Sequence, residues 1–144
     1  MKHQKIKVSL RKELGKKATK ALRKNKCVPC VLYGGGKNIH FFAEERDFRH
    51  IVYTPNVYLV ELNIDGEIYN ATLKDIQFHP VRDNILHIDF FQIFEGKKIT
   101  VEIPIKLNGL AEGVKEGGKM QIIRRKLKVK AFAADLPDQL EINV

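Results

Sequence analysis

The sequence predicts a mainly β protein: a small β-barrel with short helices, followed by a second all-β domain with too few strands to close a barrel. Three observations support this fold class. Many of the eight Phe and four Tyr residues neighbour Val, Ile or Leu, which favours strands over helix bundles. Several segments alternate apolar and polar residues. Turn-forming residues separate these segments at short intervals.

The chain begins with a predicted strand and a basic segment. Residues 6–10 alternate apolar and polar side chains, which predicts a first strand that ends near Arg11. Leu14, Ala18, Ala21 and Leu22 recur at helical spacing, which predicts a short helical or turn-rich segment with these residues packed inward. Because five like charges follow within nine residues, we expect this segment to order fully only on a phosphate surface.

Residues 28–94 supply five more strands and a second helix. The apolar run 28–33 ends at three glycines, which predict a tight turn rather than a phosphate loop, since no Ser or Thr follows Lys37. Acidic residues open a helix at Glu44 that Pro55 stops. The remaining predicted strands are 39–43, 57–64, 67–75 and 85–94, with an Asp-Gly hairpin turn at 65–66 and a loop at 79–80. We therefore assign a closed barrel to residues 1–94.

Residues 95–144 have the pattern of a separate all-β domain. Apolar segments at 97–107 and 120–133 flank a glycine-rich loop, and 140–144 reads as a strand at the end of the chain. We expect this domain to need a partner surface or residues outside this chain.

The positive charge is concentrated at the N-terminus. Eleven of the 26 Lys and Arg residues lie from Lys2 to Lys26, and this stretch holds one acid, Glu13. Its charge is therefore +10. Since the net charge of the chain is +9, the remaining residues sum to −1. A short segment of such charge is suited to holding a polyanion, and nucleic acid is the first partner to consider.

Two residue groups raise the question of metal or redox chemistry. Cys27 and Cys30 form a lone CxxC that leads into a strand rather than a helix, so reduced thiols are favoured over a redox or zinc site. His87 and Asp89 lie two apart on one strand face, with His79 nearby, as in an iron site of two histidines and a carboxylate. A polar pair that bonds its own loop is the simpler interpretation, and RNA contact is a third. We expect no metal and no cofactor.

Lys126, Lys128 and Lys130 alternate with apolar residues and so share one face of a predicted strand. A solvated face and a second phosphate contact both fit this pattern, and Arg124 and Arg125 favour contact. No apolar run reaches membrane-span length and no signal peptide pattern follows the basic start, so we expect a cytosolic, unprocessed protein with no membrane association.

Three segments resemble a known family. RKELGKKATKALRKNKCVPCVLYGGG, DIQFHPVRDNILHIDFF and IPIKLNGLAEGVKEGGKMQ, in this order and spacing, closely resemble the L-twenty-five family of bacterial large-subunit ribosomal proteins in its longer, CTC-type form. The resemblance covers nearly the whole chain. It implies an N-terminal β-barrel that grips 5S ribosomal RNA at an internal loop, followed by a C-terminal β-domain.

The resemblance also implies which residues contact the RNA. Family RNA-binding positions fall on Arg11, Lys16, Thr19, Lys20, Arg23, Tyr33, Gln77, His79, His87 and Asp89. Ala21 stands where some members carry a further arginine, and Phe78 where many carry a basic residue.

The sequence thus predicts a non-enzymatic, cytoplasmic component of the large ribosomal subunit that binds 5S ribosomal RNA and stabilises its conformation. Its C-terminal domain would meet neighbouring large-subunit components. The alternative is a stress-related interaction module whose basic arm binds RNA without sequence preference. The two hypotheses differ in whether 5S RNA is bound more tightly than any duplex RNA.

Overall fold

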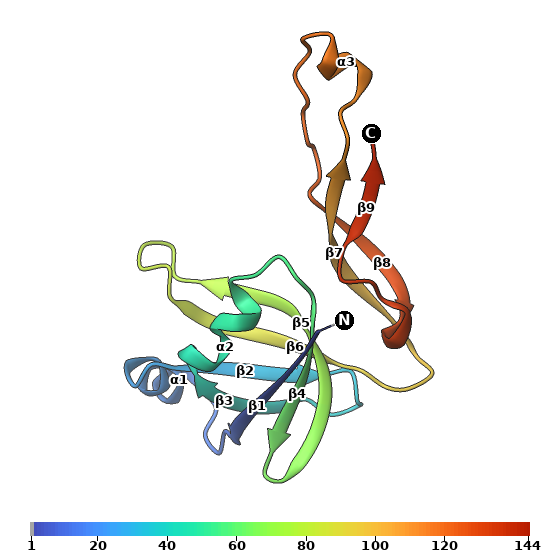
Figure 1. Ribbon diagram of the computed structural model, residues 1–144. Coiled ribbons are helices and arrows are strands. Elements are labelled where there is room, and N and C mark those ends of the chain that lie inside the picture. Colours follow the sequence, from blue (N-terminus) through green and yellow to red (C-terminus); the bar gives the residue numbers. More distant parts are fainter. Residues whose placement is uncertain (1) are drawn as a thin grey trace.

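The computed structural model describes residues 2–144 and confirms the predicted fold class (Figure 1). Six strands close into a barrel in the order β1-β3-β2-β6-β5-β4, and three further strands form a separate sheet in the order β8-β7-β9. The barrel strands are β1 (Lys2–Leu10), β2 (Cys27–Tyr33), β3 (Ile39–Glu44), β4 (Tyr58–Ile64), β5 (Glu67–Phe78) and β6 (Ile85–Gln92).

The barrel closes because β1 pairs on both sides, antiparallel with β3 and parallel with β4. Its interior is filled by alternate residues of every strand, among them Phe41, Leu62 and Phe90, all fully buried. The helix α2 (Glu45–Val52) covers one end of the barrel and inserts Phe48, whose ring centroid lies 6.0 Å from that of Phe90. The pairing of Ser9 and Leu10 with β3 joins the two ends of the six-stranded sheet.

The hairpin between β4 and β5 forms where the Asp-Gly pair predicts it. Asp65 and Gly66 both have positive φ, 49° and 88°, as a two-residue type I′ turn requires. The Asn63 side-chain oxygen accepts a hydrogen bond from the Gly66 backbone N–H at 3.1 Å. This turn fixes the β4–β5 register and thereby the positions of the residues at the far end of β5.

The C-terminal sheet consists of β7 (Lys98–Asn108), β8 (Lys126–Phe132) and β9 (Leu140–Asn143). The central strand β7 is antiparallel to β8 and parallel to β9. Its buried residues Ile99, Val101 and Ile103 form a second core with Leu136 and with Val57, which precedes β4. Figure 1 shows this sheet extending away from the barrel, with the one-turn helix α3 (Glu112–Lys115) at its far tip.

Four sequence expectations need correction. The segment 14–24 forms the helix α1 (Lys16–Lys24), but Leu14 precedes it and is 58% exposed, and Ala21 is exposed as well. The expected strand at 120–133 begins only at Lys126: the ladder with β7 ends at the pair Lys126 and Pro104, apart from one bond from the Ile105 N–H to the Arg125 carbonyl at 2.9 Å. The one-turn helix α3 lies in the glycine-rich segment that was expected to be a loop. A 3-10 turn, Ala133–Asp135, begins at the last residue of the segment that was expected to be a strand.

The fourth correction bears on function. The fifth strand was expected to end at residue 75 but continues to Phe78, with irregular pairing after Leu73 and after Gln77. Gln77 therefore lies within a strand, directly opposite His87. None of the helices among residues 2–144 is long and apolar enough to cross a membrane.

Candidate nucleic-acid interface

The basic helix α1 is attached to the barrel by an arginine at its start. Arg11, just after β1, donates from Nη2 to the Thr19 hydroxyl oxygen at 3.0 Å, and its backbone N–H donates to the His40 carbonyl at 3.0 Å. The Thr19 hydroxyl in turn donates to the Gly15 carbonyl at 2.7 Å. Arg11 and Thr19 therefore fix the beginning of α1 without a side-chain N-cap.

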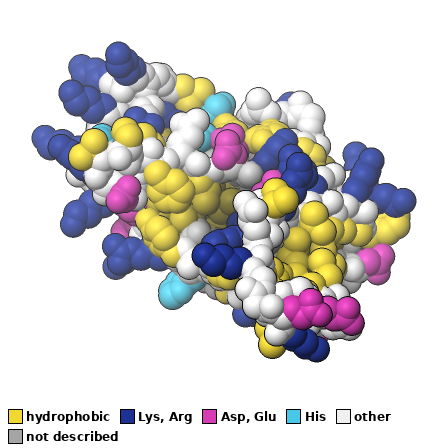
Figure 2. All heavy atoms as spheres, turned by 90° about the horizontal axis from the view of Figure 1, so that it is seen from above, with side chains coloured by type: hydrophobic (Ala, Val, Ile, Leu, Met, Phe, Trp, Pro, Cys, Tyr) yellow, Lys and Arg dark blue, Asp and Glu magenta, His cyan; other side chains and the backbone are white. Residues whose placement is uncertain are grey.

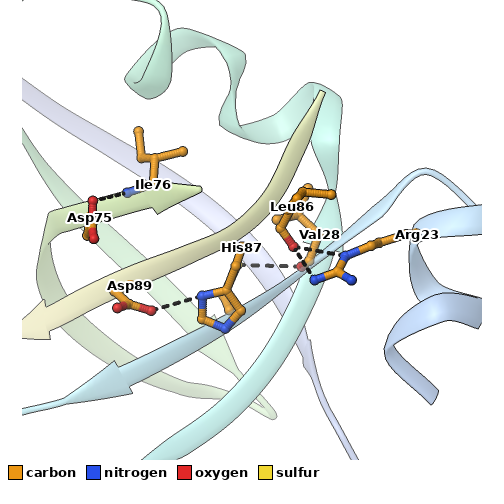
Figure 3. A network of polar contacts seen from close by, with 8 residues as sticks. Arg23, Val28, Asp75, Ile76, Leu86, His87 and Asp89 are labelled. Atoms are coloured by element: carbon orange, nitrogen blue, oxygen red, sulfur yellow. Dashed lines mark hydrogen bonds and ion pairs between the residues drawn. The ribbon is translucent and has the colours of Figure 1, made fainter. Parts of the chain in front are cut away.

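A second arginine attaches the end of α1. Arg23 donates from Nε and Nη2 to the Leu86 carbonyl, at 3.1 and 3.0 Å. Figure 3 shows this guanidinium reaching from α1 to β6, beside His87. Two of its five N–H donors are used in this way, and Nη1 has no hydrogen bond among residues 2–144. The Arg23 guanidinium is thus held at a defined place on the barrel, and its remaining N–H groups can donate to an acceptor on a binding partner.

His87 and Asp89 form a polar pair on the outer side of β6. Their Nδ1 and Oδ1 atoms are 2.9 Å apart (Figure 3). Burial lowers the pKa of His87; the Asp89 carboxylate opposes this, while the charges of Arg23 and Arg11 act in the same direction as burial. The lowered pKa favours the neutral imidazole, and in that form the His87 Nδ1–H is placed to donate to Asp89 Oδ1.

Strand pairing brings further polar side chains to this pair. Gln77 and Asp75 on β5 lie opposite His87 and Asp89, and Val31 on β2 lies opposite Asp89 from the other side. Side chains directly opposite on neighbouring strands approach within about 5.5 Å at Cβ. Gln77, His87 and Asp89 therefore form one cluster of donors and acceptors.

An aromatic pair continues this face along the barrel. Tyr33 at the end of β2 pairs with Phe91 of β6, with ring centroids 5.7 Å apart in an edge-to-face arrangement. The Lys74 ammonium lies 5.1 Å from the Tyr33 centroid and 5.5 Å from that of Phe91. Lys74 was missed in the sequence, because it continues the apolar–polar alternation of Ala71, Thr72 and Leu73 and so gives no local signal.

The remaining predicted site residues lie outside this cluster. Lys16 and Lys20 are exposed on α1. His79 follows β5, and its Nδ1 accepts from the backbone N–H groups of Val81 and Arg82 at 3.2 and 3.1 Å. Its imidazole thus organises the 79–84 turn, with the proton on Nε2.

The metal and redox hypotheses find no geometric support. Among residues 2–144 no three His, Cys, Asp or Glu side chains gather as metal ligands. Cys27 and Cys30 are free thiols. Burial raises the pKa of the Cys27 thiol and raises that of Cys30 well above its ordinary value, the opposite of what a reactive thiolate requires.

Two models of known protein families match this chain. The model of the Ribosomal L25p family matches residues 6–90, and that of the Ribosomal protein TL5, C-terminal domain, matches residues 98–144.

Curated relatives of this chain carry the name Large ribosomal subunit protein bL25, among them the following three. The protein of Bacteroides thetaiotaomicron is 56% identical over 89% of this chain and 65% of its own length. That of Phocaeicola vulgatus is 54% identical over the whole chain and 76% of its own length. That of Christiangramia forsetii is 56% identical over 94% of the chain and 63% of its own length. The chain thus spans about two thirds to three quarters of these relatives, and it belongs to the ribosomal L25p family.

Proposed function

We propose that this chain is a non-catalytic component of the large ribosomal subunit that binds 5S ribosomal RNA and stabilises one conformation of it. The observation that carries the proposal is the convergence of α1, β2, β5 and β6 on one face of the barrel. Arginines tethered to that face, Arg11 and Arg23, lie next to the polar cluster of Gln77, His87 and Asp89.

The two parts of this face have different tasks in the proposal. Arg11, Lys16, Thr19, Lys20 and Arg23 contact phosphates and supply affinity without regard to sequence. If about six phosphates are engaged, affinity falls roughly a thousandfold between about 50 and 200 mM salt.

Base and sugar edges are read by the strand residues. Duplex RNA hides its major groove and displays 2′-hydroxyls and base edges in a wide, shallow minor groove, so side chains on the outer face of the barrel can reach them. Gln77 can donate and accept, His87 donates to Asp89 and presents Nε2, and Asp89 accepts from base amino groups. Tyr33 offers an aromatic surface, and His79 orders the turn beside this face.

The test is equilibrium binding of the purified chain to 5S ribosomal RNA and to a perfect duplex RNA of equal length, at several salt concentrations. We expect a clear preference for 5S RNA together with a steep salt dependence. Equal affinity for both RNAs would instead favour the stress-related module with non-specific binding. We further propose that residues 95–144 face neighbouring components of the large subunit.

A further inference from the structure

The C-terminal sheet carries a second concentration of positive charge. Five of the seven residues from Arg124 to Lys130 are basic, and no acid occurs between residues 117 and 134. All five basic side chains are exposed. The N-terminal excess of charge obscures this group when only the net charge of the chain is considered.

Strand pairing places three of these lysines in a row on one face of β8. Lys126, Lys128 and Lys130 lie opposite Pro104, Glu102 and Thr100 of β7, whereas Val129 and Ala131 pack against the second core. Alternate residues of a strand repeat at roughly 6.6 Å. The lysine row, residues 126, 128 and 130, is therefore a regular series of ammonium groups along an exposed sheet edge.

The lysine row borders a cleft between the C-terminal sheet and the barrel. This cleft has a volume of about 700 Å³ and is lined by parts of β5, β7 and β8 and by the segment after α2. Four lysines line it (Lys74, Lys98, Lys126 and Lys128) against two acids (Asp75 and Glu102). Glu102 is 4.0 Å from Lys128. Figure 2 shows Lys and Arg side chains beside a hollow with apolar walls in this part of the molecule.

The cleft is continuous with the proposed RNA-reading face. Lys74 lines the cleft and also lies over the rings of Tyr33 and Phe91. Asp75, another lining residue, lies opposite Asp89. An RNA strand that leaves the polar cluster along β5 therefore meets Lys74 first and the lysines of β8 next.

We infer that the cleft and the lysine row bind the sugar–phosphate backbone of the same RNA, beyond the segment read by the barrel. This inference rests on the proposed function. The excess of lysines, their regular spacing and their continuity with the polar cluster fit a polyanionic strand. The contacts extend the footprint and add affinity, but they read no bases.

The experiment compares two triple variants of the full chain that lose the same charge. K126Q/K128Q/K130Q removes the lysine row, and K106Q/K115Q/K119Q removes three exposed lysines elsewhere in the C-terminal region. All six side chains are exposed, so both variants should melt like the unmodified chain. Binding to 5S ribosomal RNA is measured against salt concentration, with Arg23→Ala as a reference.

We expect the lysine-row variant to bind at least about tenfold more weakly near 150 mM salt, with a slope of log affinity against log salt that is shallower by about two. The control variant should change affinity less than about threefold, since screening at this salt acts over about 8 Å. If both triple variants lower the affinity for 5S RNA equally, while the unmodified chain still prefers 5S RNA and Arg23→Ala still weakens binding, this inference is overturned and the proposed function stands. An unmodified chain without 5S preference overturns the proposed function and the inference with it.

Discussion

At the scale of single residues, the candidate site contains charges held by neutral partners. Arg23 donates to a backbone carbonyl and Arg11 to a hydroxyl, so neither positive charge is cancelled by these bonds. A salt bridge would have oriented the side chains equally well but would have neutralised them. Carbonyl and hydroxyl partners orient each guanidinium and leave its charge for a phosphate.

Replacing Arg23 tests this arrangement. We expect Arg23→Ala to weaken binding to 5S and duplex RNA alike by roughly tenfold and to reduce the salt slope by about 0.9, because one phosphate contact is lost. Arg23→Lys is the matched control: it keeps the charge and the slope but loses the two-pronged bond to Leu86. A salt slope unchanged in Arg23→Ala would remove Arg23 from the phosphate contacts.

Asp89 should affect recognition rather than charge attraction. For Asp89→Asn we expect the preference for 5S over duplex RNA to fall roughly tenfold with little change in salt slope, because a base-edge acceptor is replaced by a mixed donor and acceptor. Equal weakening towards both RNAs would contradict a readout role.

The Asp89→Asn variant also tests the pKa of His87. The Asp89 carboxylate raises the pKa of His87 and partly offsets the lowering by burial and by the two arginines. Neutralising Asp89 should therefore lower this pKa further, and His87 should stay neutral to a lower pH. An NMR pH titration of the His87 ring checks this, and an upward shift would contradict the assigned pair.

At the scale of elements, α1 is a helix whose position depends on its tethers more than on its packing. None of its residues is buried, and Ala18 and Leu22 are only partly covered. Five basic residues on nine positions disfavour the isolated helix. The bonds of Arg11 and Arg23 connect its two ends to the barrel, so the residues that serve RNA binding in our proposal also position the helix.

The exposed residue Ala21 permits a test of α1 alone. Proline at this interior position costs the helix about 3 kcal/mol, and we expect Ala21→Pro to weaken 5S RNA binding at least about tenfold. The melting temperature of the barrel should change little, because α1 contributes no buried residue. Ala21→Ser serves as control. Unchanged RNA affinity of Ala21→Pro, with helix loss verified by circular dichroism, would show that α1 is dispensable.

At the scale of the whole molecule, the closed barrel and the open C-terminal sheet have separate cores. We propose the domain boundary at residues 94 and 95 on this basis. Val57 and Ile93 precede this boundary but pack with the second core, where Val57 lies with Ile99, Val101 and Leu136. This contact fixes one wall of the cleft that borders the lysine row.

A fragment of residues 1–94 should fold by itself, since all six barrel strands and the larger core lie within it. We expect cooperative thermal unfolding and a retained preference for 5S RNA. Its salt slope should be shallower than that of the full chain by the contribution of the lysine row. A fragment without a cooperative transition would place the boundary elsewhere.

Local patterns in the sequence determined much of this molecule. The alternation of apolar and polar residues, the Asp65-Gly66 turn and the apolar face of α2 each depend on residues close together in the sequence. The fold class and most strands therefore follow from the sequence pattern. The N-terminal charge and the shared face of His87 and Asp89 are likewise local.

Only the tertiary structure decided which residues meet. The extension of β5 that places Gln77 opposite His87, the bond between Arg23 and Leu86, and the cleft that joins Lys74 to β8 all connect residues far apart in the chain. Such contacts depend on register and on barrel closure, which no short segment encodes. For the same reason the helical spacing of Leu14 and Ala21 could not show that both stay exposed, since burial depends on which distant parts of the chain pack against a side chain.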